Sequence, residues 1–161
     1  MPRFYNYKIL TSKIRINILT IPNETYMKNF KDFYAIKLHD TDAAGILFFA
    51  SQFKMAHDVY EKFLGQIGFP FIQRFKVKDF YIPIVHAEAD YRQPLKVGDV
   101  VEVALEVANI GKSSFTLEFT LTDLDGITVG TARMVHVTID PQTMKKIDLP
   151  GDFRAKLEEY L

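Results

Sequence analysis

The hydrophobic pattern of the chain has a helical period in its first half and a strand period in its second half. Apolar residues between positions 49 and 67 recur every three or four residues, which is the spacing of one helical face. These residues are Phe49, Phe53, Ala56, Tyr60, Phe63, Leu64 and Ile67. Gly65 and the run Gly68-Phe69-Pro70 supply stop signals. We therefore expect one long helix that starts at Phe49 or Ala50, with Ser51 as a candidate cap.

From Tyr81 onward, apolar and polar residues alternate in four segments, which is the period of strands that bury one face. The apolar faces are Val85, Ala87, Ala89 and Tyr91; Val101, Val103, Leu105 and Val107; Phe115, Leu117, Phe119 and Leu121; and Val129, Val135 and Val137 within residues 127–139. The connections are short, and Asp125-Gly126 is a hairpin signal, so neighbouring strands must be antiparallel. His86 and His136 fall on the polar faces, and we expect both at the surface or at a subunit interface.

Three shorter segments complete the predicted order. Residues 33–38 alternate as a first strand, residues 70–80 form a short helical or irregular link, and residues 152–161 form an amphipathic terminal helix. The apolar face of the sheet must be covered, and only the helix over residues 49–67 is long enough to cover it. The chain is therefore expected to have an α+β fold in which a curved antiparallel sheet of about five strands wraps around one long central helix.

Composition limits the classes of partner and chemistry. The chain has 161 residues, of which 48% are hydrophobic, so it is expected to bury a sizeable core. It carries 20 basic and 20 acidic residues, and this zero net charge gives no overall field for nucleic acid or an anionic membrane. The absence of cysteine excludes disulfides, thiolate zinc sites and a thiol nucleophile. No apolar run approaches the ~20 residues that cross a bilayer, and we expect a cytoplasmic protein.

The first 26 residues differ from the rest of the chain. They contain Arg3, Lys8, Lys13 and Arg15 against the single acid Glu24, and their apolar alternation is weak. This pattern suits a short extra strand, a basic tail, or a leader before a true start at Met27. We expect residues 1–26 to be a dispensable N-terminal extension and residues 27–161 to be the functional domain.

Turn chemistry immediately precedes the predicted helix. Residues 40–45 read DTDAAG, in which aspartate and threonine side chains cap local backbone and Gly45 permits positive φ. Helix N-terminal N–H groups carry partial positive charge and suit a developing oxyanion. Acidic side chains and a positively polarised helix end are therefore expected to lie close together.

Four motifs follow one another between residues 30 and 150: DTDAAGI (40–46), IPIV (82–85), YRQPLKVGD (91–99) and GKSSF (111–115). Together they resemble the 4-hydroxybenzoyl-CoA thioesterase family, which has the hotdog fold, a curved sheet around a central helix. The resemblance implies an acyl-CoA thioesterase that uses no metal or organic cofactor. It also implies at least a dimer, either a dimer or a tetramer, with the active site between subunits.

The resemblance places the catalytic carboxylate at Asp42 and the polarising donor at the backbone N–H of about Phe49, with Gly45 in the same motif. Asp42 either attacks the carbonyl or activates water. Asp40 is read as a turn residue or a supporting group. His39 with Asp40 and Asp42 makes a weak metal candidate, because adjacent loop residues rarely form a metal site, and we expect no metal.

The predicted helix also carries polar residues that the resemblance places near the acyl group. His57 aligns with a position that lines the acyl pocket of 4-hydroxybenzoyl-CoA thioesterase, where the resemblance implies an aspartate. This difference argues against 4-hydroxybenzoyl-CoA itself as the substrate. Glu61 lies four residues later and shares the face of His57. The plainer interpretation of His57, Asp58 and Glu61 is a solvated polar face.

Coenzyme A carries phosphate charges, and the resemblance implies that residues near the entry to the strand over 115–121 meet its nucleotide. Lys112 matches a basic position, and Ser113 and Ser114 follow it. Backbone N–H groups of this turn also suit a phosphate. Arg92 and Lys96 are candidate helpers, although exposed loop cations are usually only solubilising.

The sequence predicts a thioesterase acting on an aromatic or medium-length acyl-CoA, and a naphthoyl thioester is an attractive member of this class. The first alternative is a hotdog acyl-thioester dehydratase or hydratase that uses His57 with Asp58 or Glu61. The second is a non-catalytic acyl-CoA-binding protein, which would have no need of Asp42.

Overall fold

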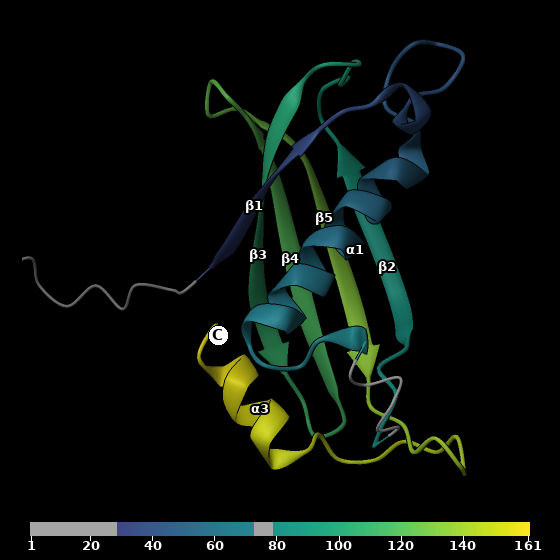
Figure 1. The fold of residues 1–161 in the computed structure, drawn as a ribbon, viewed down its shortest axis with the longest axis vertical. Coiled ribbons are helices and arrows are strands. Elements are labelled where there is room, and N and C mark those ends of the chain that lie inside the picture. Colours follow the sequence, from purple (N-terminus) through teal and green to yellow (C-terminus); the bar gives the residue numbers. More distant parts are fainter. Residues whose placement is uncertain (1–28, 73–78) are drawn as a thin grey trace, which may run out of the picture.

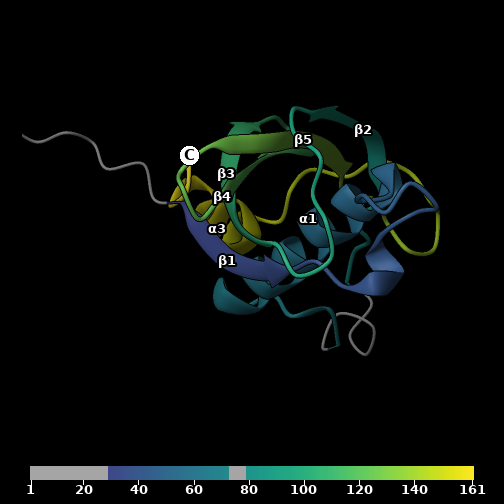
Figure 2. The ribbon, with the colours of Figure 1, turned by 90° about the horizontal axis from the view of Figure 1, so that it is seen from above.

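One antiparallel sheet curls around a single long helix (Figures 1 and 2). The structure, a computed structural model, describes residues 29–72 and 79–161. Its strands are β1 Phe30–Ala35, β2 Ile84–Tyr91, β3 Val100–Ile110, β4 Ser114–Asp123 and β5 Thr128–Val137, and its helices are a 3-10 turn at Leu38–Asp40, α1 Phe49–Gln66 and α3 Gly151–Glu158. The strand order is β1-β3-β4-β5-β2. This arrangement confirms the predicted hotdog fold.

The core forms where the concave face of the sheet meets α1. On β3 and β4 the predicted alternation is confirmed, because Val101, Val103, Leu105, Phe115, Leu117 and Leu121 are fully buried. Met55, Ala56 and Phe63 of α1 pack against them. Helix α3 closes one end of the core with Phe153 and Leu157. The two apolar periods therefore meet in one core, as expected.

Helix α1 ends in a glycine-dependent motif. Gly68 has φ +87°. Its N–H donates to the carbonyl of Gly65, and the N–H of Phe69 donates to the carbonyl of Leu64. This pair of hydrogen bonds is the Schellman arrangement. Gly68 thus stops the helix, as predicted, whereas Gly65 lies inside it.

The helix start and the first strand differ from expectation. Phe48 is the N-cap residue and caps only through its backbone, while Ser51 lies in the first turn, so the proposed Ser51 cap was wrong. Strand β1 covers Phe30–Ala35 rather than residues 33–38. The chain leaves the sheet early because the Asp40 N–H bonds the Lys37 carbonyl at 2.9 Å and forms the 3-10 turn.

The predicted inner face of strand β5 is confirmed at Val129 and Val137, which are buried, but not at Val135. Its pairing with β4 shifts between Leu121 and Thr122, and this irregularity changes the alternation after Val129. Met134 and His136 are consequently buried, and Val135 lies on the outer, half-buried side. The prediction that His136 lies at the surface was wrong, while His86 is exposed as expected.

Strand β2 lies at a free edge of the sheet. Among the described strands it pairs only with β5, and its side chains are exposed on both faces except for half-buried Ala89. Val85, predicted to be core, is 57% exposed, and Tyr91 is 50% exposed. The apolar face of β2 is therefore not buried within this chain.

The described ranges contain no helix that is both long and apolar enough to cross a membrane. The predicted extension over residues 1–26 and most of the predicted link over 70–80 lie outside the described residues.

Candidate active site

Asp42 lies in a tight loop between β1 and α1. Its backbone N–H donates to the carbonyl of Ile46 at 3.0 Å, and its carbonyl accepts from the Gly45 N–H at 3.0 Å. Its carboxylate oxygen Oδ1 accepts from the Ala44 N–H at 2.8 Å. Gly45 has φ +73°, a conformation that favours glycine. Asp42 is exposed, and none of the described residues bonds its second carboxylate oxygen.

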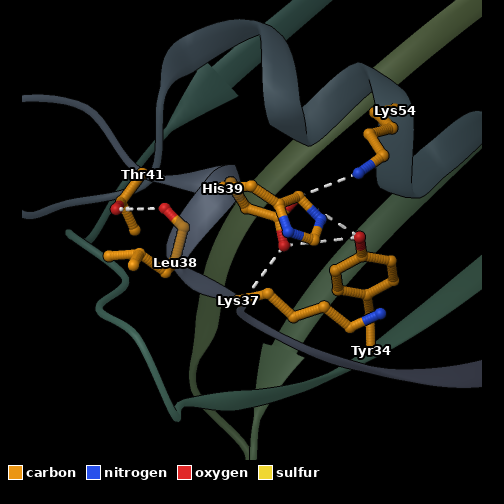
Figure 3. A network of polar contacts seen from close by, with 7 residues as sticks. Tyr34, Lys37, Leu38, His39, Thr41 and Lys54 are labelled. Carbon is orange, nitrogen blue, oxygen red and sulfur yellow. Dashed lines mark hydrogen bonds and ion pairs between the residues drawn. The ribbon is translucent and has the colours of Figure 1, made fainter.

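The neighbouring Asp40 anchors this loop from inside. Its carboxylate is fully buried and accepts from the Lys37 N–H at 2.9 Å and from the Lys54 ammonium at 3.0 Å. Tyr34 approaches the same carboxylate at 3.4 Å (Figure 3). Burial alone would raise the pKa of Asp40, but the Lys37 and Lys54 bonds outweigh it and hold the pKa below its usual value. Asp40 is thus a supporting group, and Lys54 connects it to α1.

The loop and the start of α1 are also joined through the backbone. The Phe48 N–H donates to the Asp40 carbonyl at 2.9 Å, and the Leu47 N–H donates to the Leu95 carbonyl at 2.8 Å. Among the described residues, none accepts a hydrogen bond from the N–H of Phe49, which is the first residue of α1. This N–H carries the partial positive charge of a helix N-terminus, as the predicted oxyanion donor requires.

Two side chains connect the start of α1 to the sheet. The Tyr91 hydroxyl, at the end of β2, donates to the Phe49 carbonyl at 2.9 Å. The buried Gln52 carboxamide donates to the Asp90 carbonyl at 3.2 Å and to the Thr131 carbonyl at 2.8 Å. These bonds hold the helix N-terminus against β2 and β5.

A groove of about 400 Å³ runs along this helix N-terminus. It is lined by Asp42, Ile46, Leu47, Phe48, Phe49, Gln52, Tyr91, Arg92, Gln93, Pro94 and Leu95. The residues that carry the predicted carboxylate and the predicted N–H donor, Asp42 and Phe49, therefore border the same groove. Arg92 is the basic residue on the groove, whereas Lys96 is not among its lining residues.

His57 and Glu61 border a different cavity, of about 440 Å³. Its other lining residues are Tyr60, Phe71, Ile82, Ile84 and His136. The His57 ring stacks on Phe71 with centroids 6.0 Å apart. Asp58 lines neither this cavity nor the groove but a third hollow beside β1. Of the two pairs proposed for a dehydratase, His57 with Glu61 therefore borders one cavity, whereas His57 with Asp58 does not.

Lys112, Ser113 and Ser114 lie at the turn between β3 and β4, at the opposite end of the sheet from the start of α1 (Figure 1). The Lys112 ammonium is highly exposed and lies 3.5 Å from the Asp148 carboxylate. The Ser113 carbonyl accepts from the Thr138 N–H at 3.0 Å, and the Ser114 carbonyl accepts from the Gly111 N–H. Within one chain these three residues are not brought to Asp42.

The metal candidate is not supported by the geometry of its residues. The Asp40 carboxylate is already bonded to Lys54, and His39 lies 3.6 Å from it. In residues 29–72 and 79–161, no three histidine, aspartate or glutamate side chains gather as possible metal ligands.

Sequence reasoning missed Tyr91, Gln52 and Tyr60 as site residues. Tyr91 was assigned to the core because β2 alternates, and alternation does not show that a strand is at an edge. Gln52 had a readable signal, since it is a polar residue beside the apolar positions Phe49, Phe53 and Ala56 on one helix face. Tyr60 was read only as core.

Comparison with known proteins places these features in context. The profile of the thioesterase-like superfamily matches residues 36–157. A 1,4-dihydroxy-2-naphthoyl-CoA hydrolase of Prochlorococcus marinus is 34% identical over 131 residues, 77% of this chain and 84% of that protein. One from Microcystis aeruginosa is 36% identical over 119 residues, 74% of this chain and 86% of the relative. The crystal structure of a 1,4-dihydroxy-2-naphthoyl-CoA thioesterase from Synechocystis superposes with a TM-score of 0.76 at 27% identity, covering 81% of this chain and 96% of the other.

Proposed function

The chain belongs to the thioesterase-like superfamily, and we propose that it hydrolyses the thioester of a hydroxylated aromatic acyl-CoA, specifically 1,4-dihydroxy-2-naphthoyl-CoA. One observation carries the reaction: exposed Asp42 borders the same groove as Phe49, whose N–H has no acceptor among the described residues. The naphthoyl substrate is carried over from the relatives at 34% and 36% identity. The narrower resemblance to 4-hydroxybenzoyl-CoA thioesterases stays a prediction.

The proposed chemistry needs water and this chain's own groups, without a metal or organic cofactor. The thioester carbonyl oxygen accepts from the Phe49 N–H, where the helix N-terminus stabilises the negative charge that develops. Asp42 either activates a water molecule or attacks the carbonyl carbon itself, and water then releases the acid from the resulting anhydride. In both routes the C–S bond breaks, the thiol of coenzyme A takes a proton, and one water is consumed.

Asp42→Asn tests this assignment. The asparagine oxygen still accepts from the Ala44 N–H, so the turn is retained while the negative charge is lost. We expect thiol release from 1,4-dihydroxy-2-naphthoyl-CoA to fall about 10²–10⁴-fold, the usual contribution of an acid-base group. Asp140→Asn is the matched control, because Asp140 also accepts backbone N–H groups within a turn. Undiminished turnover by Asp42→Asn would reject the proposal.

We also propose that two copies pair through the free edges of β2 around a two-fold axis. Backbone groups on this edge are available for strand pairing, and Val85 and Tyr91 present apolar surface there. Antiparallel self-pairing places the first residues of β2 in one chain beside the last residues of β2 in the other. The predicted coenzyme A residues at the β3–β4 turn then approach the end of the partner that carries Asp42, which they do not approach within one chain (Figure 1).

Val85→Lys tests this pairing, since a charge on an edge strand opposes edge-to-edge association. Light scattering after size exclusion should show a shift toward monomer. Val97→Lys, which alters a similarly exposed valine in the loop after β2, should leave the molar mass unchanged. A monomeric wild type would refute the pairing.

A further inference from the structure

Tyr60 and His136 bury polar atoms that have no hydrogen-bond partner among the described residues. Tyr60 is 1% exposed and His136 is fully buried, and their ring centroids lie 4.6 Å apart. The unpartnered atoms are the Tyr60 hydroxyl and both ring nitrogens of His136. Each such atom typically costs about 1–3 kcal/mol. Three in one place therefore call for a functional explanation.

Both residues line the cavity of about 440 Å³ that also holds His57 and Phe71. Their rings form part of its wall, and their polar atoms lie beneath this wall, closed to water in this structure. His136 additionally stacks on Phe115, with centroids 4.8 Å apart and planes 4° apart. The cavity thus has aromatic walls, and unpaired polar atoms lie behind two of them.

The charge state of this pair limits what it can bind. Burial lowers the pKa of His136 to about 4, and the nearby Ile82 carbonyl opposes this shift without meeting the geometry of a hydrogen bond. Burial also raises the pKa of Tyr60. Both groups are neutral near pH 7, and each offers one donor and at least one acceptor. A hydroxyl group, which both donates and accepts, is complementary to them, whereas an alkyl chain leaves all three atoms unpaired.

The position of the cavity indicates whether it lies near the groove of the same chain or near the groove of a second copy. Helix α1 rises 1.5 Å per residue, so Tyr60 lies about 16 Å beyond Phe49 along the axis, farther than a two-ring acyl group extends. Ile84 borders the cavity and Tyr91 borders the groove, and they are the two ends of β2. Antiparallel pairing of β2 with a second copy places Ile84 of one chain opposite Tyr91 of the other.

We propose that Tyr60 and His136 recognise the hydroxyl groups of the aromatic acyl group. The substrate that they recognise is the one whose thioester lies in the groove beside Asp42 of the partner subunit. This inference rests on the proposed thioesterase function and on the proposed pairing of β2. It assigns Tyr60 and His136 to substrate specificity and leaves the bond-breaking step to Asp42 and Phe49.

Tyr60→Phe tests the recognition, because it removes only the hydroxyl. We expect kcat/KM for 1,4-dihydroxy-2-naphthoyl-CoA to fall about 10-fold, and kcat/KM for 2-naphthoyl-CoA to change less than about twofold. The melting temperature should stay or rise, since an unpaired buried hydroxyl is lost. Tyr160→Phe, at another buried tyrosine, should affect both substrates equally. An equal loss on both substrates in Tyr60→Phe would overturn the proposal.

A mixed dimer tests the partner assignment. Asp42→Asn and Tyr60→Phe chains are co-expressed with different tags, and the heterodimer is purified. If recognition comes from the partner, one site carries both changes and the other carries neither, so the heterodimer shows the substrate preference of wild type. If it instead shows the preference of Tyr60→Phe, the two residues act within one chain and the partner assignment fails.

Calorimetric titration with the free acids separates this proposal from the proposed function. If neither CoA ester releases thiol, the hydrolase proposal has failed. Tighter binding of 1,4-dihydroxy-2-naphthoate than of 2-naphthoate, lost in Tyr60→Phe, would still support the recognition site. Equal binding of the two acids by wild type would overturn that site even in an active thioesterase.

Discussion

The hydroxyl of Tyr91 donates a hydrogen bond to the backbone carbonyl of Phe49 at 2.9 Å and joins the last residue of β2 to the first residue of α1. Partial burial raises the pKa of Tyr91, so the hydroxyl keeps the proton that it donates. The bond holds the carbonyl of Phe49, whose own N–H has no acceptor among the described residues. The position of the proposed oxyanion donor therefore depends on an edge strand.

Tyr91→Phe should lower activity without unfolding the protein. A neutral hydrogen bond contributes about 0.5–1.5 kcal/mol, which corresponds to a fall of about 2- to 12-fold in kcat if the bond positions the donor in the transition state. Steady-state thiol release should show the loss in kcat, with KM changed less. Tyr81→Phe, at an exposed tyrosine three residues before β2, serves as the control. A change confined to KM would argue that Tyr91 contacts substrate instead.

The Asp40–Lys54 pair should stabilise the fold more than an ordinary surface pair does. Lys54→Met leaves the buried Asp40 carboxylate without its cation, and we expect the free energy of unfolding to fall by about 1–2 kcal/mol, because the Lys54 side chain is itself 49% exposed. Urea denaturation measures this change. Lys62→Met breaks the exposed pair with Asp32 and should cost less than about 1 kcal/mol. Equal losses in the two variants would contradict the anchoring role of Asp40.

Gly130 is required by the close approach of Gln52. A Cβ built on Gly130 lies 2.6 Å from Gln52 Oε1 and 3.1 Å from the Asp90 carbonyl. Gly130→Ala should therefore displace the Gln52 carboxamide and destabilise the protein by about 1–3 kcal/mol. Gly65→Ala is the contrasting case, since nothing lies within 4 Å of its Cβ and alanine favours the helix, so it should stabilise by about 0.5–1 kcal/mol. Thermal unfolding of both variants checks the opposite signs.

His136 should make the fold sensitive to mild acid. Its folded-state pKa is about 4, below the ordinary value of 6.5. Between these pH values the unfolded chain binds a proton that the folded chain refuses, so stability falls as the pH drops from about 6.5 to 4. The loss between pH 7 and 4.5 should be on the order of 2–3 kcal/mol.

His136→Phe should remove this part of the acid sensitivity while keeping a ring stacked on Phe115. Urea denaturation at pH 7 and pH 4.5 gives the difference, and losses due to carboxylates such as Asp40 are common to both proteins. His86→Gln, at an exposed histidine, should keep the acid sensitivity of wild type. If His136→Phe loses as much stability in acid as wild type, the buried neutral histidine is not the cause.

The sequence by itself determined the elements and their order. The three-and-four spacing around Ala56 and Phe63 predicts a helix, and the strict alternation over residues 101–121 predicts strands that bury one face, because these periods follow from local backbone geometry. The DTDAAG turn before the helix likewise predicts an acidic group near a helix N-terminus. The local part of the candidate site, Asp42 with Phe49, could therefore be found without a structure.

Only the tertiary structure decided which residues from distant segments meet. The register shift between β4 and β5 turns His136 inward, and the place of β2 at the sheet edge exposes Val85 and brings Tyr91 to Phe49. Neither follows from the period, because a bulge or an edge depends on pairing between strands that are far apart in sequence. Lys112 lies far from Asp42 because β3 carries the chain to the opposite end of the sheet from the start of α1 (Figure 1).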